Sequence, residues 1–375
     1  MKRGGGFMRL RGMVRKEWLQ ILRDPSSIAI AFVLPMILLL LFGYGVSLDA
    51  KHVPLALVVE KPDPRTMSFT AGFYQSEYFQ PIPMHTIQEA ETALRHRIVD
   101  GIVWLRANFG RDYLKKDAPP ISVIVNGVDA NSGRLIQGYV QGVWVKWLDQ
   151  QALEGGGELN MPVRVEQRIW YNPEVRSRNY LVPGIIAVIM TLIGALLTAL
   201  VISREWERGT MEALLVTPVS VREILLGKLL PYFILGMGGL TLSVAMALLV
   251  FQVPLRGSMA VLFGCSALFL LTALGMGLLI STLSRNQFVA AQVAIIVTFL
   301  PAFLLSGFIF DIASMPAGIR NLTYIIAARY YVAILQTVFL AGDVWSVIWP
   351  NAAALAAMAL FFLAVVRRKT RKRLD

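Results

Sequence analysis

The sequence predicts an α-helical polytopic membrane protein, with six transmembrane helices and an α/β extracytoplasmic domain inserted between the first and the second. The first observation behind this fold class is a set of six long stretches without Asp, Glu, Lys, Arg or His. They cover residues 25–48, 179–203, 229–255, 257–284, 286–310 and 344–366. A helix of about 20 apolar residues crosses the hydrocarbon core of a bilayer and satisfies its own backbone hydrogen bonds there.

The second observation is the uneven distribution of Lys and Arg around these stretches. The N-terminal segment, the loop 204–228, Arg285 and the tail 367–375 together hold 18 of them. The short loops on the other side hold only Arg256, Arg320 and Arg329. Basic residues concentrate on the cytoplasmic side, so both termini are predicted to be cytoplasmic. The net charge of +12 therefore reflects the excess of basic residues on the cytoplasmic side, where they attract anionic membrane lipid. No nucleic-acid partner is predicted.

The third observation is the mixed character of residues 49–178, where short apolar runs alternate with helical patterns. The predicted strands are Val53–Val59, Gly101–Leu105, Ile121–Val125 and Val163–Trp170, and the predicted helices are Ile87–Ile98 and Arg134–Gln151. The only cysteine, Cys265, falls in the fourth stretch, so this domain has no disulfide. Its histidines lack ligand-like spacing, and no metal site is predicted.

Residues 1–24 are predicted to form an amphipathic helix in the cytoplasmic membrane interface. Its apolar face consists of Leu10, Val14, Trp18 and Ile21. Asp24 then supplies an N-cap and Pro25 a first-turn proline, so the first transmembrane helix, 25–48, starts at that point.

The loop after the second transmembrane helix is predicted to contain a short helix of its own. Gly209 stops the preceding helix, Thr210 caps the short helix, and Thr217-Pro218 ends it. Ser220 and Glu223 have the spacing of a capping box that opens the third transmembrane helix. Within residues 179–366, the uncharged run Tyr330–Gly342 has 13 residues, which are too few to cross the bilayer, so a re-entrant segment is predicted near 319–342 on the outer side.

The sequence gives no sign of an energy source within the chain. It has no phosphate-binding loop of the G-x-x-x-x-G-K-[ST] type. The six stretches have no ionisable group of the kind a proton-coupled carrier uses, although a cation site of backbone carbonyls stays open. The outer domain shows no nucleophile with a base and no metal cluster. We therefore predict a chain that is not an enzyme and is driven by a separate ATPase, with an ion-gradient carrier and a membrane enzyme or assembly factor as the alternatives.

Several local runs resemble those of the permease subunits of ABC type-2 exporters. They are Lys16-Glu17, Arg23-Asp24-Pro25, the run 204–215 with Thr217-Pro218, the run 275–281, the run 305–310, and Ser314-Met315-Pro316. These matches extend over essentially the whole chain. One departure is Ala327-Ala328-Arg329-Tyr330, where relatives commonly have Pro-Ala-Arg-Tyr.

The resemblance implies a coupling helix, 209–218, that sits in a groove of a cytoplasmic ABC ATPase. The coupling residues would be Glu205, Glu207, Arg208, Gly209, Thr210, Glu212, Leu214, Leu215, Thr217 and Pro218, with Lys16, Glu17, Arg23 and Asp24 on the interface helix. The alternative is that these charges merely solvate a loop. ATP and Mg²⁺ would be bound by the partner ATPase, and this chain itself would bind no cofactor.

The resemblance also implies a multi-pass protein of the bacterial inner (plasma) membrane that works with a second permease, either the same chain or a paralogue. A periplasmic adaptor is a further candidate partner. The substrate pathway would be bordered by the second and fifth helices, with Thr191, Thr198, Gln292, Thr298 and Ser306 as its polar members. Small residues on such faces more often serve helix packing. Drugs or other hydrophobic compounds are the cargo that the family suggests, while lipid, sodium ion and polymer remain compatible with the residues.

Overall fold

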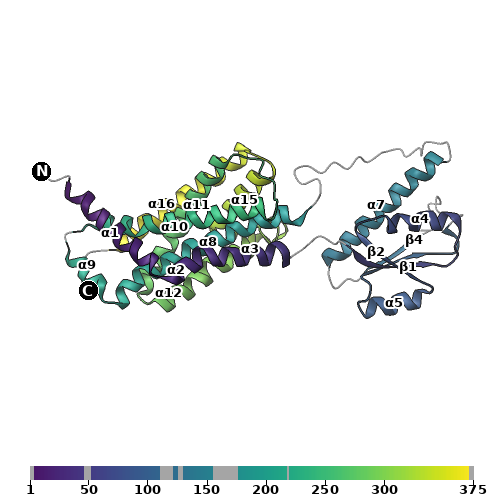
Figure 1. The fold of residues 1–375 in the computed structure, drawn as a ribbon, viewed down its shortest axis with the longest axis horizontal. Helices are drawn as coiled ribbons and strands as arrows, with labels where there is room; N and C mark the ends of the chain where they lie inside the picture. The colour runs from purple at the N-terminus through teal and green to yellow at the C-terminus, as the bar shows by residue number, and fades with distance from the viewer. Residues whose placement is uncertain are drawn as a thin grey trace. The chain divides into compact units, whose positions relative to one another are not determined.

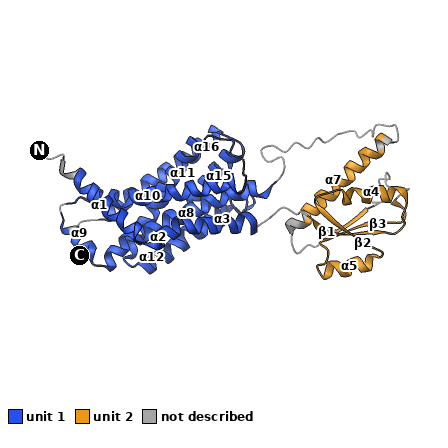
Figure 2. Ribbon diagram, in the orientation of Figure 1, with its two compact units in different colours: residues 1–47, 168–375 blue, residues 48–167 orange. Residues whose placement is uncertain are grey.

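The computed structural model describes residues 4–45, 52–109, 121–125, 130–154, 176–217 and 219–370. The chain divides into two compact units (Figure 1, Figure 2). Unit 1 comprises residues 1–47 and 168–375 and is helical, whereas unit 2 comprises residues 48–167 and contains a sheet. Each unit is described by itself.

Unit 1 contains the transmembrane helices. Six helical segments of the described residues are long and apolar enough to cross a membrane, which confirms the number predicted. They are Pro25–Gly45 (α2, η1 and α3), Ser177–Glu207 (α8), Val221–Leu249 (α10), Met259–Ser284 (α11), Gln287–Leu305 (α12, η2 and α13) and Trp345–Lys369 (α16). Helix α1, Gly4–Leu22, precedes them.

A bent pair lies between the fifth and sixth transmembrane helices. Ala317–Ile325, which comprises α14 and the short helix η4, meets α15, Ala327–Leu340, at 87°. This geometry is that of a broken span or a re-entrant loop, and it coincides with the re-entrant segment predicted near 319–342.

Helix α8 is the centre of unit 1, since 89% of its most apolar segment is buried. Small residues let neighbouring helices approach it closely. A Cβ added at Gly194 would lie 2.5 Å from the Cβ of Ala273 on α11, and one at Gly277 would lie 2.1 Å from the Thr198 hydroxyl. Thr198 also donates a hydrogen bond to the carbonyl of Leu274 at 3.0 Å.

Two of the transmembrane helices contain a short π-helical segment shortly before a proline. These segments are η1, Ala29–Val33, and η2, Ile295–Phe299, and the prolines are Pro35 and Pro301. A proline removes one backbone donor and crowds the carbonyl four residues earlier, so a wider turn relieves the clash locally.

Unit 2 is a four-stranded sheet with helices on both faces (Figure 1). The strand order is β2-β1-β3-β4, with β1 parallel to β2 and β3, and β4 antiparallel to β3. The strands are β1 Val53–Val59, β2 Phe79–Met84, β3 Gly101–Leu105 and β4 Ile121–Val125. Alternate residues of the strands pack against α4 (Pro64–Tyr74) and α7 (Ala130–Glu154) on one face and against α5 (Ile87–Arg95) on the other.

The structure confirms the predicted bounds of β1, β3 and β4. The two predicted helices, Ile87–Ile98 and Arg134–Gln151, correspond to α5 and α7, whose ends differ by a few residues. The predicted strand Val163–Trp170 lies outside the described residues. The sequence reading missed α4 and β2. Strand β2 contains Pro81 and Pro83, which suits its position at the edge of the sheet, where a missing backbone donor costs no ladder hydrogen bond.

Candidate functional site

The short helix α9, Thr210–Val216, connects α8 to α10 at one end of unit 1. Gly209 precedes it in the left-handed conformation, with φ of 66°, which glycine adopts without the clash that a Cβ would cause. The N-cap is therefore Gly209, and the prediction that Thr210 caps α9 is wrong. Ser220 and Glu223 form both hydrogen bonds of the predicted capping box at the start of α10.

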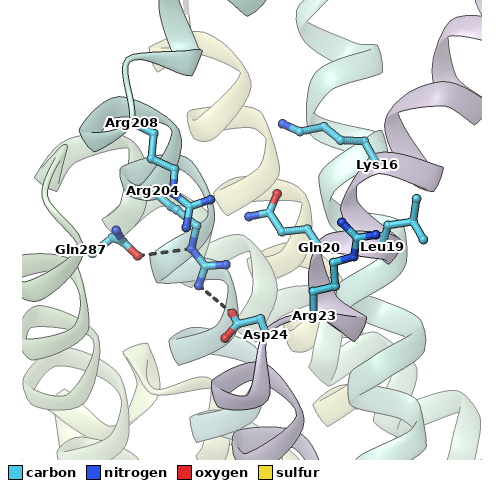
Figure 3. A pocket seen from close by; sticks show the side chains of 8 residues that line it. All are labelled: Lys16, Leu19, Gln20, Arg23, Asp24, Arg204, Arg208 and Gln287. Carbon is cyan, nitrogen blue, oxygen red and sulfur yellow. Dashed lines mark hydrogen bonds and ion pairs between the residues drawn. The ribbon is translucent and has the colours of Figure 1, made fainter.

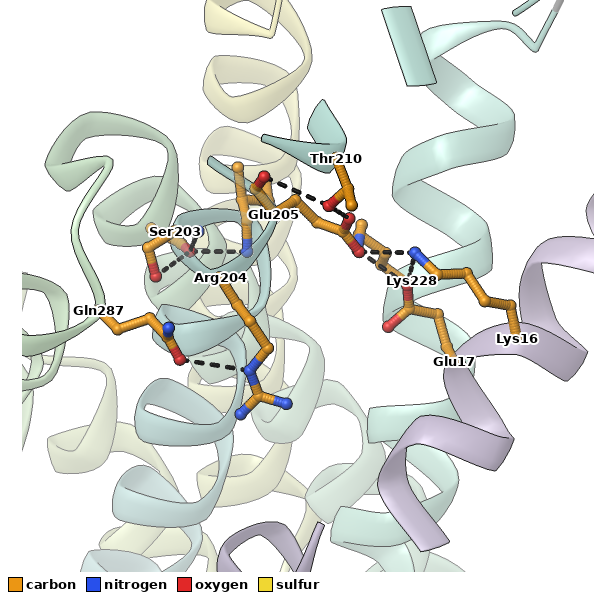
Figure 4. Close-up of polar contacts among 10 residues, drawn as sticks. Lys16, Glu17, Ser203, Arg204, Glu205, Thr210, Lys228 and Gln287 are labelled. Carbon is orange, nitrogen blue, oxygen red and sulfur yellow. Dashed lines mark hydrogen bonds and ion pairs between the residues drawn. The ribbon is translucent and has the colours of Figure 1, made fainter. Parts of the chain in front are cut away.

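A buried cluster of charges joins α9 to three other helices (Figure 4). The ammonium nitrogen of Lys228, on α10, lies 2.8 Å from Oε1 of Glu17 on α1 and 2.9 Å from Oε1 of Glu205 on α8. The side chains of Lys228 and Glu17 are each 1% exposed. Lys16 approaches the same oxygen of Glu205 at 2.7 Å, and the hydroxyl of Thr210 donates to the other oxygen.

The cluster is balanced in charge, with two ammonium groups facing two carboxylates. Such balance is a condition for burying ions, because the desolvation of each charge has to be offset by its partners. Glu205 is the member shared by Lys16, Lys228 and Thr210. The start of α9 is therefore fixed to α8, α10 and α1 through one carboxylate.

A second polar group links the preceding residue of α8, Arg204, to other helices (Figure 3). Arg204 donates to Oδ2 of Asp24 at 2.9 Å and to the amide oxygen of Gln287, on α12, at 3.3 Å. Asp24 also caps α2, as predicted, by accepting from the backbone of Ser26. Partial burial raises the pKa of Asp24, but the Ser27 hydroxyl and the Arg204 charge outweigh it and hold that pKa below its ordinary value of 3.8.

An open cavity of about 590 Å³ lies beside this second group (Figure 3). It is lined by Lys16, Leu19, Gln20, Arg23, Asp24, Arg204, Arg208 and Gln287. Four of these side chains are cationic and one is anionic, so the cavity has positive character. It is a surface suited to carboxylate or phosphate groups.

The predicted interface-helix and coupling residues lie near one another in the structure, but their side chains have different contacts and burial. Lys16, Glu17, Glu205 and Thr210 belong to the cluster around Lys228, in which Glu17 and Glu205 are buried whereas Lys16 and Thr210 are exposed at its edge. Glu205, which was predicted to contact a partner, is 4% exposed and bonded within the chain.

The remaining predicted coupling residues make other contacts. Glu207 accepts a hydrogen bond from the backbone of Gln287, and Thr217 donates to the carbonyl of Leu214. On α9, Glu212 is exposed and Leu214 is half-buried. The side chains of Leu215 and Pro218 lie outside the described parts of the chain.

The sequence reading missed Lys228, which it placed just before the third uncharged stretch. No local signal marks this residue as buried, because its partner Glu17 is 211 positions away. The only indication was that a lone lysine directly precedes an uncharged stretch of transmembrane length.

The candidate pathway residues are scattered. Thr191 and Thr298 line the same small cavity, of about 50 Å³, between α8, α11 and the fifth transmembrane helix. Thr198 is fully buried in the contact between α8 and α11, as the packing alternative describes. Gln292 is exposed, and the buried Ser306 accepts a hydrogen bond from the backbone of Phe308. Within the described ranges, no group of three or more His, Cys, Asp or Glu could hold a metal ion.

The fold and this site define a multi-pass helical membrane protein in which a short helix is anchored to the bundle by buried ion pairs. Residues 25–367 match the family model described as ABC-2 family transporter protein, and the chain belongs to this family. It is a multi-pass inner-membrane protein of the ABC transporter permease class, and membership implies an ABC ATPase as a partner subunit.

Three relatives from Escherichia coli strain K12 are similar over most of their length. The probable multidrug ABC transporter permease YbhS is 44% identical over 370 residues, 98% of each chain. The probable multidrug ABC transporter permease YbhR is 30% identical over 368 residues, 97% of this chain and 99% of its own. The inner membrane transport permease YhhJ is 26% identical over 351 residues, 89% of this chain and 92% of its own.

Proposed function

We propose that this chain is the permease subunit of an ATP-driven exporter and that α9 is the element through which the ATPase moves it. The observation that carries this proposal is the buried cluster around Glu205, which joins α9 to α1, α8 and α10. If this segment were only a solvated connecting loop, buried ion pairs would not be needed to hold the start of α9 in place.

The exposed side chains of α9 supply the contact surface in this proposal. Glu212 and Val216 face outward, and Val216 is 78% exposed. An exposed acidic residue beside an exposed apolar one suits a shallow groove on a partner protein. The open cationic cavity next to α1 adds a complementary surface for acidic side chains of the same partner.

The proposed orientation places α9 and both termini in the cytoplasm and unit 2 outside. Its reason is that basic residues concentrate in the N-terminal segment, the loop that contains α9 and the C-terminal tail. The partner ATPase would bind ATP and Mg²⁺. A second permease, identical or paralogous, would complete the pathway, and a periplasmic adaptor could engage the outer unit.

The proposed cargo is a drug or another hydrophobic compound. Two observations support it: the apolar character of α8 and of the fifth transmembrane helix, and the similarity to two permeases named as probable multidrug transporters. Thr191 and Thr298 are the polar side chains that would meet such a cargo between these helices.

The experiment compares ATPase association and dye extrusion in proteoliposomes that contain the chain and its ATPase. Glu212→Arg and Val216→Asp should each lower ATPase association and ATP-dependent extrusion at least tenfold while leaving the thermal midpoint of the permease unchanged. Glu91→Arg, the same charge reversal at an exposed helical position of unit 2, should leave both intact. Extrusion that persists without ATPase and collapses with the ion gradient would show a carrier instead.

A further inference from the structure

A second cavity lies on another side of the same end of unit 1. It is a groove of about 370 Å³ between α10 and α16, with α11 beneath it. Leu229, Leu278 and Val366 form its floor, and each is at most 8% exposed. Leu226 stands at its rim and is 53% exposed. The body of the groove is therefore apolar and formed by three transmembrane helices.

Two arginines lie at the end of this groove. Arg222 is in the first turn of α10 and Arg367 is in the last turn of α16, and both side chains are exposed. No carboxylate lines the groove among the described residues. The neighbouring Glu223 is already engaged, because it lies 3.5 Å from Arg9 and closes the capping box with Ser220. The charge at the groove's end is thus uncompensated by its lining.

An apolar groove that ends in two cations has the chemistry of a phospholipid site. Leucine side chains in membrane-spanning helices meet acyl chains, whereas arginine binds phosphate oxygens in a planar, two-pronged geometry. Basic pockets between transmembrane helices at a membrane surface select anionic headgroups for this reason. We propose that the groove binds one anionic phospholipid, with an acyl chain along the leucines and its phosphate between Arg222 and Arg367.

Such a lipid would connect α10 to α16 across the groove over α11. Arg222 follows α9 by only six residues. The bound lipid would therefore stabilise the first turn of α10, the helix that follows α9. This inference concerns lipid binding and does not depend on the ATPase or the cargo.

Native mass spectrometry of the delipidated full-length chain tests the proposal, with phosphatidylglycerol and phosphatidylcholine of identical acyl chains as probes. We expect tighter binding of phosphatidylglycerol. An arginine that bonds the phosphate directly should change lipid affinity at least about fivefold, so Arg222→Gln with Arg367→Gln should weaken phosphatidylglycerol roughly thirty-fold or more. Leu226→Trp, which narrows the groove at its exposed rim and keeps both charges, should also weaken it.

The matched control is Arg368→Gln with Lys369→Gln. It removes the same charge from the same helix end, at exposed side chains outside the groove. Its affinity should stay within about threefold of the wild type. Equal weakening by this control would assign the binding to general surface charge and overturn the proposal. Equal affinity for phosphatidylcholine, or no effect of Leu226→Trp, would overturn it as well.

Discussion

Replacing Lys228 with methionine tests the buried cluster most directly, since methionine keeps the apolar stem and deletes the charge. In the variant Glu205 keeps Lys16 at 2.7 Å, but the nearest ammonium group to Glu17 is then 3.8 Å away. One carboxylate that is 1% exposed is left without a close cation. Breaking a buried pair by removing one partner costs about 3–5 kcal/mol, and the remaining lysine places this case near about 3.

The assay is unfolding of the purified chain by SDS in mixed micelles, followed by tryptophan fluorescence. Arg15→Met is the control, because it removes an exposed cation from α1, the helix that carries Glu17, and should change the free energy of unfolding by less than about 0.5 kcal/mol.

The double variant Lys228→Met with Glu17→Gln removes one charge of each sign and should recover about 2 kcal/mol of the loss. If Lys228→Met costs under about 1 kcal/mol, or if the double variant costs the sum of its singles, the cluster does not hold these helices together.

Three further predictions concern packing, backbone and pH. Gly277→Ala would place a Cβ 2.1 Å from the Thr198 hydroxyl and should lower the free energy of unfolding by about 1–3 kcal/mol, measured by SDS unfolding. The control Gly264→Ala, on the same helix, adds a Cβ that meets nothing within 4 Å and should be neutral. Gly209→Ala should cost about 1–2 kcal/mol, because alanine at a φ of 66° is strained, and should raise hydrogen exchange of the α9 amides. The lowered pKa of Asp24 means that its charge contributes stability above pH 3.8 that is lost as the pH falls through the folded-state value. The stability difference between wild type and Asp24→Asn should accordingly be constant from pH 7 to 5 and shrink below 3.8.

Local sequence patterns were enough to predict much of the fold. Strands β1, β3 and β4 are apolar runs bounded by turn residues, and their predicted bounds agree with the structure. Helix α4 was missed although Asp63-Pro64 repeats the Asp24-Pro25 start signal, because the helix itself mixes threonine, serine and aromatic residues without a clear apolar face. The π-helical turns before Pro35 and Pro301 depend on how each helix absorbs a lost hydrogen bond, which composition does not reveal.

The site was predictable only where its determinants are local. The Ser220 capping box and the Asp24 cap are short-range hydrogen bonds, and the structure contains both. The burial of Lys228 and Glu205 depends on the approach of α1, which is distant in sequence. In the sequence, Lys228 is indistinguishable from a charged residue at the boundary of a transmembrane helix. Its burial in the cluster follows only from the packing of α1 against α10.

The two polar groups take their α8 members from adjacent residues, whose side chains leave the helix about 100° apart. Arg204 points to Asp24 and Gln287 (Figure 3), whereas Glu205 points to Lys228 and its partners (Figure 4). Rotation of the α8 end in either direction would lengthen ion pairs on one side. Since breaking a buried pair is costly, small forces on α9 should move α8, α1 and α10 together as one block. Under the proposed function, weakening the cluster should therefore leave ATP hydrolysis by the partner in place while extrusion falls, because the motion would be absorbed where α9 meets α8.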